Sequence, residues 1–297
     1  MIFCWCGGYL FRLKNIKDFL KGILKNQYFR FVMIELSSLL LTPFWFNIGA
    51  ISEMDNWGYK ICGIFKFTNT GVLIGAMWFV PFYTLSLVIY YLVNIAVKKY
   101  GDIMLGICTL LLGILGVYLV NKNLLNFHYF NRALLSQPVF FIGNYCKKKW
   151  NIIKNYIKKW MFIPLAGIIF ILNSVSGKEV ELTKNLLYGN WGFYLITFAG
   201  ILFCLSLGME FMEKKTGDVI ACIGKNSYWI MALHFMFFKI WDLCVSIIVK
   251  GKMTTDLKSY PNFSLIYFMT GILGPIIVSI ILNKIVEIRK CRYEGNN

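Results

Sequence analysis

Eight stretches of the sequence are long and apolar enough to cross a membrane. A helix needs about 20 mostly apolar residues to span a hydrocarbon core about 30 Å thick. The composition agrees with this. The chain has 58% hydrophobic and 15% charged residues, whereas a soluble domain has roughly 45–50% apolar and about 25% charged residues. We therefore predict an all-α, polytopic transmembrane helix bundle that forms one integral membrane domain over residues 1–297. The predicted spans lie at about residues 31–50, 71–97, 102–120, 129–145, 160–175, 191–208, 227–249 and 263–283.

The net charge of +17 would indicate a nucleic-acid partner in a soluble chain, so its meaning depends on where the basic residues lie. Of the 31 Lys and Arg residues, 21 fall in loops on one side of an alternating eight-span path and 8 on the other. Arg132 and Lys239 lie within or at the edge of spans. Loops rich in Lys and Arg mark the cytoplasmic side. We predict a multi-pass protein of the cell membrane, with both termini cytoplasmic, basic loops facing anionic lipid and no nucleic-acid partner.

Residues 1–11 form an apolar segment that is too short to cross a bilayer, because such a helix measures only about 16 Å. Basic residues follow it, from Arg12 to Arg30, whereas a signal peptide carries them before its apolar run. The pattern is typical of the second half of a membrane helix. The prediction is therefore eight full spans plus a partial N-terminal helix, with a segment missing upstream.

The sequence carries no recognisable metal or phosphate-loop motif. The nine cysteines lack the spacing of a metal site with His partners, and we interpret them as small apolar packing residues. HExxH, GxSxG and Gly-rich phosphate loops are absent from the sequence. We expect no metal and no permanently bound cofactor.

A few ionisable residues lie inside the predicted spans, where charges are costly and normally face the bundle interior. Glu35 lies about one turn into its span. Lys239 and Asp242 are three residues apart, so they can neutralise each other on one helix face. His234 has no opposite charge at i±3 or i±4, and Ser227 precedes it by two turns on nearly the same face. A lone histidine in an apolar helix is compatible with a structural hydrogen bond as well as with catalysis.

Several short motifs resemble one protein family. The run IGKNS at Ile223–Ser227, followed by LHF at Leu233–Phe235, resembles the signature near the C-terminal end of the membrane-bound acyltransferase 3 family. It is most similar to the branch of sugar O-acetylases related to fucose 4-O-acetylase. GGYLFR at Gly7–Arg12, the basic stretch to Arg30 and MWFV at Met77–Val80 resemble other family motifs in the family's order, with Gly7 where Ser is usual.

The resemblance implies a ten-helix membrane enzyme. Such an enzyme transfers an acyl group, usually acetyl from acetyl-CoA as co-substrate, to a hydroxyl of a sugar or cell-surface polysaccharide. The family's first helix carries an Arg and, eleven residues later, a His regarded as the general base. No span of this sequence contains that pair. The resemblance therefore implies an N-terminally truncated acyltransferase 3-like domain, and it leaves open whether this chain is active.

Acyl transfer to a sugar requires a base for the hydroxyl proton and donors for the developing oxyanion. Histidine suits the first task, because its ordinary pKa of about 6.5 lies near neutral pH. His234 is therefore the candidate catalytic residue. The candidate substrate-binding residues are Ser227 and Asn226 for orienting substrate or CoA, Lys225 (with Lys147–Lys149) for CoA phosphates, Trp78 for a pocket wall, Arg132 for a sugar hydroxyl or phosphate, and Glu35. Trp78 could equally be a membrane anchor at the interface, and Arg132 could equally be a residue whose side chain snorkels to the interface.

Two other functions remain open at this point. The chain could be a transporter or flippase of lipid-linked sugars that uses Glu35, Lys239 and Asp242, or an inactive remnant with a structural role. Matched inverted repeats would favour a transporter, and none is visible in the sequence.

Overall fold

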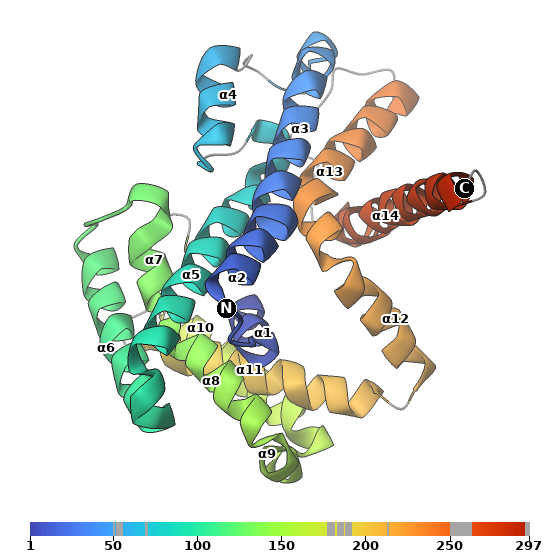
Figure 1. Cartoon of the computed structure of the whole chain (residues 1–297). Helices are drawn as coiled ribbons and strands as arrows, with labels where there is room; N and C mark the ends of the chain where they lie inside the picture. The colour runs from blue at the N-terminus through green and yellow to red at the C-terminus, as the bar shows by residue number, and fades with distance from the viewer. Residues whose placement is uncertain are drawn as a thin grey trace. The chain divides into compact units, whose positions relative to one another are not determined.

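A computed structural model describes residues 1–49, 51, 56–68, 71–176, 182, 187, 192–212, 214–249 and 263–294 (Figure 1). These residues are 89% helical and include no strand, which confirms the all-α prediction. They form two compact units, residues 1–27 with 80–217, and residues 28–79 with 218–297. Each unit is described by itself.

Five helical stretches among the described residues are long and apolar enough to cross a membrane, or six if one bent pair counts as a span. The chain is thus a polytopic membrane protein, while the count of eight spans stays a prediction. The stretch Leu73–Asn121 holds two of the predicted spans, because a turn at Gly101 separates its two main helices. Gly101 has a φ of +79°, which glycine adopts without a steric penalty. The stretches are Ile16–Asn47, Leu73–Asn121, Gly192–Phe211, Ser227–Ile248 and Ser264–Lys284, and the bent pair is Trp150–Tyr156 with Lys159–Leu172.

The first unit holds most of the helices. They are α1 (Ile2–Leu10), α2 (Ile16–Ile23), α5 (Phe79–Val97), α6 (Gly101–Asn121), α7 (Phe130–Leu135), α8 (Gln137–Lys148), α9 (Trp150–Tyr156), α10 (Phe162–Ser176) and α11 (Gly192–Phe211). The apolar start of the chain is α1, a helix of nine residues. The predicted span at 129–145 is a broken helix, α7 and α8, interrupted at Ser136.

Glycines let α1 and α8 approach each other closely. A methyl group on Gly8 would lie 2.0 Å from the carbonyl oxygen of Phe140, and one on Gly143 would lie 2.1 Å from that of Trp5. Asn144, one residue further along α8, donates from Nδ2 to the Gly8 carbonyl at 3.4 Å. Small residues allow such backbone contacts between membrane helices. This crossing fixes the N-terminal segment against the bundle.

Two buried side chains donate hydrogen bonds at the break between α7 and α8, the hydroxyl of Ser136, which bonds to the Ala133 carbonyl at 2.8 Å, and the amide of Gln137. Gln137 is fully buried, and its Nε2 donates to the carbonyl oxygens of Ala133 at 2.7 Å and Ser86 at 3.1 Å. The second bond ties the break to α5. Pro138 in the first turn of α8 lacks an N–H that would need a partner there. Irregular backbone at membrane depth requires such internal partners.

The second unit contains α3 (Phe29–Asn47), α4 (Trp57–Phe65), the 3₁₀ segment η2 (Val72–Trp78), α13 (Ser227–Val249) and α14 (Ser264–Glu294), with α12 (Lys215–Lys225) leading into α13. Helices α13 and α14 pack against each other. Gly271 and Gly274 of α14 make this possible, because added methyl groups would lie within 2.6 Å of the rings of Phe238 and Phe237.

Candidate functional site

His234 lies on α13, two turns after its first residue, Ser227. Its Nδ1 is 2.9 Å from the carbonyl oxygen of Ile230 and 3.0 Å from that of Met231. A carbonyl oxygen only accepts hydrogen bonds, so Nδ1 carries the hydrogen. In the neutral ring, Nε2 is then the acceptor. Among the described residues, Nε2 has no hydrogen-bond partner. This nitrogen is therefore available to receive a proton.

The surroundings of His234 are apolar and half-buried. The ring of Phe235 lies 4.2 Å from the imidazole, centroid to centroid, and that of Phe238 lies 5.5 Å from it. A methyl group on Gly271 of α14 would be 3.5 Å from the Cβ of His234. The segment η2 also packs on α13, where Gly75 lies beside Phe235. The imidazole thus lies among aromatic rings on a helix that two other segments contact.

The predicted binding residues of the IGKNS run occupy the joint between α12 and α13. Lys225 is the exposed last residue of α12, Asn226 forms the joint, and Ser227 begins α13. The Nδ2 of Asn226 donates to the Cys222 carbonyl at 2.8 Å. The Asn226 backbone N–H also bonds to that carbonyl, at 3.2 Å, so Asn226 holds the C-terminal end of α12 with both its backbone and its side chain. The side chains of Lys225 and Ser227 make no hydrogen bond within the described part of the chain.

Sequence reasoning missed one cation beside this joint. The guanidinium carbon of Arg30, at the start of α3, lies 5.9 Å from the ring centroid of Tyr228. This is within the usual range of a cation–π contact. The sequence placed Arg30 only in a basic loop, because a contact between residues 198 positions apart leaves no local pattern. The one sequence feature that could have pointed to this contact is the position of Arg30 directly before the predicted span at 31–50.

Glu35 lies in the same unit, where it binds backbone. Its side chain is buried, and its Oε2 accepts a hydrogen bond from the Gly71 N–H at 3.2 Å. Gly71 precedes the first residue of η2, so the carboxylate satisfies an N–H group at the start of that segment. Trp78 ends η2 and packs edge-on against Phe79, with 6.2 Å between centroids. Glu35 and Trp78 therefore belong to the α3–η2 part of the unit.

Asp242 and Lys239 do not form the pair suggested by their spacing. The Asp242 carboxylate, on α13, accepts a hydrogen bond from the hydroxyl of Tyr267 on α14. Both side chains are buried. This bond joins α13 to α14 about two turns beyond His234, and neither helix alone predicts it.

Arg132 belongs to the other unit, in α7. It is buried, and its guanidinium carbon lies 5.0 Å from the ring centroid of Tyr129. The loop before it contains four non-glycine residues with φ between 46° and 62°, which store steric strain. Asn131 holds this loop through hydrogen bonds from Nδ2 to Asn126 Oδ1 at 2.6 Å and to the Leu124 carbonyl at 3.2 Å. The strained residues are Asn123, Leu125, His128 and Tyr129.

These features define a polytopic helical membrane protein with a half-buried histidine among aromatic rings on α13. Residues 1–284 match the acyltransferase 3 family, described as an acyltransferase domain. The chain belongs to this family and is thus a membrane acyltransferase. Comparisons with curated proteins and with solved structures found no match. No group of three or more His, Cys, Asp or Glu side chains among the described residues is arranged to hold a metal ion.

Proposed function

We propose that this protein transfers an acyl group, acetyl from acetyl-CoA, to a hydroxyl of a sugar or cell-surface polysaccharide. Membership of the acyltransferase 3 family supports acyl transfer in general. The observation that carries the proposal is the hydrogen bond from His234 Nδ1 to the Ile230 carbonyl. It leaves Nε2, rather than Nδ1, to act on the acceptor.

In the proposed reaction, the acceptor hydroxyl oxygen attacks the thioester carbonyl carbon while Nε2 of His234 takes the hydroxyl proton. The tetrahedral intermediate collapses, the carbon–sulfur bond breaks, and the imidazolium returns the proton to the sulfur of CoA. The products are the O-acyl sugar and the CoA thiol. General base catalysis of this kind contributes about 10²- to 10⁴-fold to a rate.

The joint before α13 offers groups for the donor. Lys225 and Arg30 are exposed cations in the same unit as His234, and cations bind phosphate groups such as those of CoA. Ser227 and His234 are seven residues apart on one continuous helix, which places them about 10 Å apart along its axis. We propose that CoA phosphates bind at the joint and that the thioester reaches along α13 toward His234.

The test uses membranes that contain the full chain, labelled acetyl-CoA and a surface-polysaccharide acceptor. The chain has two histidines, which supplies a matched control. His234→Gln is expected to lower label transfer by about 10²- to 10⁴-fold, whereas His128→Gln should leave it within about twofold. Equal activity of His234→Gln and the wild type at equal membrane abundance would refute the assignment of His234. Transfer of label to water alone, with or without acceptor, would refute the sugar acceptor.

The proposed location is the cell membrane, with both termini cytoplasmic, so that the joint before α13 faces the compartment that contains CoA. This orientation rests on the unequal distribution of Lys and Arg between the two sets of loops.

A further inference from the structure

The lysine-rich segment between α8 and α10 contains a sharp bend. Helix α9 meets the helical stretch Lys159–Leu172, which includes most of α10, at an angle of 65°. Ser206 of α11 is fully buried, and its hydroxyl donates to the carbonyl oxygens of Lys158 at 3.0 Å and Lys159 at 3.1 Å. Ile157, which lies between the two helical pieces, is also buried. The bend is therefore held in place by α11.

Helix α9 has one face toward the protein and an apolar face that is exposed. Trp150 and Ile153 are half-buried, and the ring of Trp150 packs edge-on against Tyr9 of α1 with 5.8 Å between centroids. Ile152 and Tyr156 are four residues apart, so they share a different face of the helix. They are 56% and 75% exposed. An isoleucine and a tyrosine thus lie together, uncovered by the described part of the chain.

The third face of α9 is polar. It consists of Asn151, Lys154 and Asn155, which are all exposed. Water around the whole helix would favour polar side chains on both exposed faces, whereas lipid around it would exclude the lysine and asparagines. A helix that lies in the membrane interface has one apolar face toward the acyl chains and one polar face toward water. The faces of α9 match this arrangement.

The angle of the bend agrees with an interfacial helix. The stretch after the bend is the predicted span at 160–175, and its exposed side chains Ile163 and Phe170 lie seven residues apart on one face of α10. Membrane helices tilt by about 20° on average. A helix at 65° to one of them therefore lies nearer to the membrane plane than to the membrane normal. Trp160, exposed at the bend, is a residue type enriched at membrane–water interfaces.

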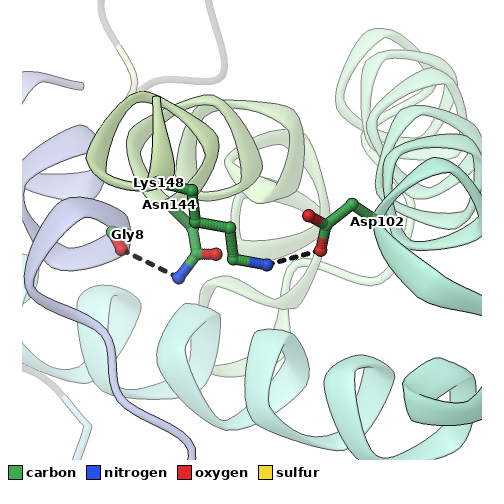
Figure 2. A network of polar contacts seen from close by, with 4 residues as sticks. All are labelled: Gly8, Asp102, Asn144 and Lys148. Atoms are coloured by element: carbon green, nitrogen blue, oxygen red, sulfur yellow. Dashed lines mark hydrogen bonds and ion pairs between the residues drawn. The ribbon is translucent and has the colours of Figure 1, made fainter. Parts of the chain in front are cut away.

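The lysines around α9 differ in whether they have a partner within the protein. Lys147 donates from Nζ to the Phe11 carbonyl at 3.3 Å. Lys148 pairs with Asp102 of α6, as Figure 2 shows. Three exposed lysines make no ion pair within the described residues, namely Lys149, Lys154 and Lys158. Their ammonium groups are available to anionic headgroups, which attract lysines near a membrane surface.

We propose that α9 lies in the membrane interface as an in-plane helix that binds anionic phospholipid. Ile152 and Tyr156 lie among the acyl chains. The ammonium groups of Lys149, Lys154 and Lys158 bind headgroup phosphates. The Lys and Arg content of the loops predicts only the side of the membrane that they face, whereas this proposal places one helix within the lipid. A second copy of this chain on the same apolar face would bring two sets of unpaired lysines together, so charge favours lipid.

The experiment places a spin label at single positions of the full chain in vesicles of phosphatidylglycerol and phosphatidylcholine. The nine native cysteines are replaced first. Collisions of the label with O₂, which concentrates in lipid, are compared with collisions with a water-soluble nickel chelate. The ratio of the two rates should be several-fold higher for Ile152→Cys and Tyr156→Cys than for the adjacent controls Asn151→Cys and Asn155→Cys.

Three patterns would overturn the proposal. Preference for the nickel chelate at all four positions would place α9 in water. Preference for O₂ at all four would make α9 part of a transmembrane helix. Few collisions with either reagent at Ile152→Cys and Tyr156→Cys would mean that protein covers the apolar face.

A second measurement tests the three lysines. Spin-labelled phosphatidylglycerol and phosphatidylcholine with matched acyl chains report which lipid contacts the protein. Lys149→Gln, Lys154→Gln and Lys158→Gln together should lower the preference for phosphatidylglycerol, by up to about fivefold for each lysine at a headgroup. Arginine at the same three positions keeps the charge and should keep the preference. An unchanged preference in the glutamine variant, or an equal loss in both variants, would overturn the assignment of the lysines.

Discussion

The Nδ1 of His234 donates a hydrogen bond to the carbonyl oxygen of Ile230, 2.9 Å away on the same helix. This bond fixes the tautomer of the neutral ring, as neighbouring acceptors do in many catalytic histidines. It also means that His234 has a structural contact and a free basic nitrogen at once. The two roles are separable, because each belongs to a different ring nitrogen.

We predict that His234→Asn separates these roles. The asparagine amide reaches about as far as Nδ1 and can still donate to a main-chain carbonyl, but it offers no base in the position of Nε2. Acyl transfer should fall by about 10²-fold or more, while the thermal unfolding midpoint in detergent stays close to that of the wild type. His234→Gln, which extends its amide toward the Nε2 position, serves as the comparison. Retained transfer in both variants would leave His234 with a structural role alone.

For Glu35 we expect that a conservative substitution leaves acyl transfer intact, unlike at His234, because the observed contact of Glu35 is with the backbone. Glu35→Gln keeps an oxygen that can accept from the Gly71 N–H, so folding and transfer should both persist. Glu35→Ala removes the acceptor from the half-buried Gly71 N–H, at a cost of about 1 kcal/mol. The measurement compares unfolding midpoints and transfer rates of the two variants. Loss of transfer in a stably folded Glu35→Gln protein would assign a proton-dependent role to this carboxylate.

The sequence predicted relationships that lie within one helix. The seven-residue spacing of Ser227 and His234 required only a continuous helix, and α13 is continuous over both. Contacts between helices were not predictable, because the partner lies far away in the chain. Asp242 illustrates this, since Lys239 was its best local partner and Tyr267 is its actual hydrogen-bond donor. Side-chain spacing on one helix carries no information about a neighbouring helix.

The break inside the predicted fourth span had a local signal that a count of apolar residues overlooks. Pro138 is typical of the first turn of a helix, and α8 begins one residue before it. The strained loop before Arg132 had no such signal, because left-handed residues such as Leu125 and Tyr129 are unusual for their residue types. Tertiary contacts, here those of Asn131, hold them in that conformation.

The glycine crossing of α1 and α8 predicts a large effect of a single methyl group. Gly143→Ala would place Cβ 2.1 Å from the Trp5 carbonyl oxygen, and backbone cannot move aside as a side chain does. We expect destabilisation of about 1–3 kcal/mol, measured by unfolding in detergent. Gly200→Ala in α11, where an added methyl meets nothing within 4 Å, should be neutral or stabilising by up to about 1 kcal/mol. Similar midpoints for the two variants would contradict the close contact of α1 and α8.

The last prediction concerns orientation in the membrane, which follows from the Lys and Arg distribution rather than from any contact. A single engineered cysteine at Asn56, before α4, is expected to react in intact cells with a thiol reagent that cannot cross membranes. One at Lys149, after α8, should not. Both variants are made in a cysteine-free background, because exposed native thiols such as Cys62 would also react. Opening the cells must make both positions reactive, which controls for burial. Labelling of Lys149→Cys in intact cells would place the lysine-rich end of α8 outside. The proposed access of CoA from the cytoplasm would then fail, because Lys225 belongs to the same set of basic loops as Lys149 on the predicted path.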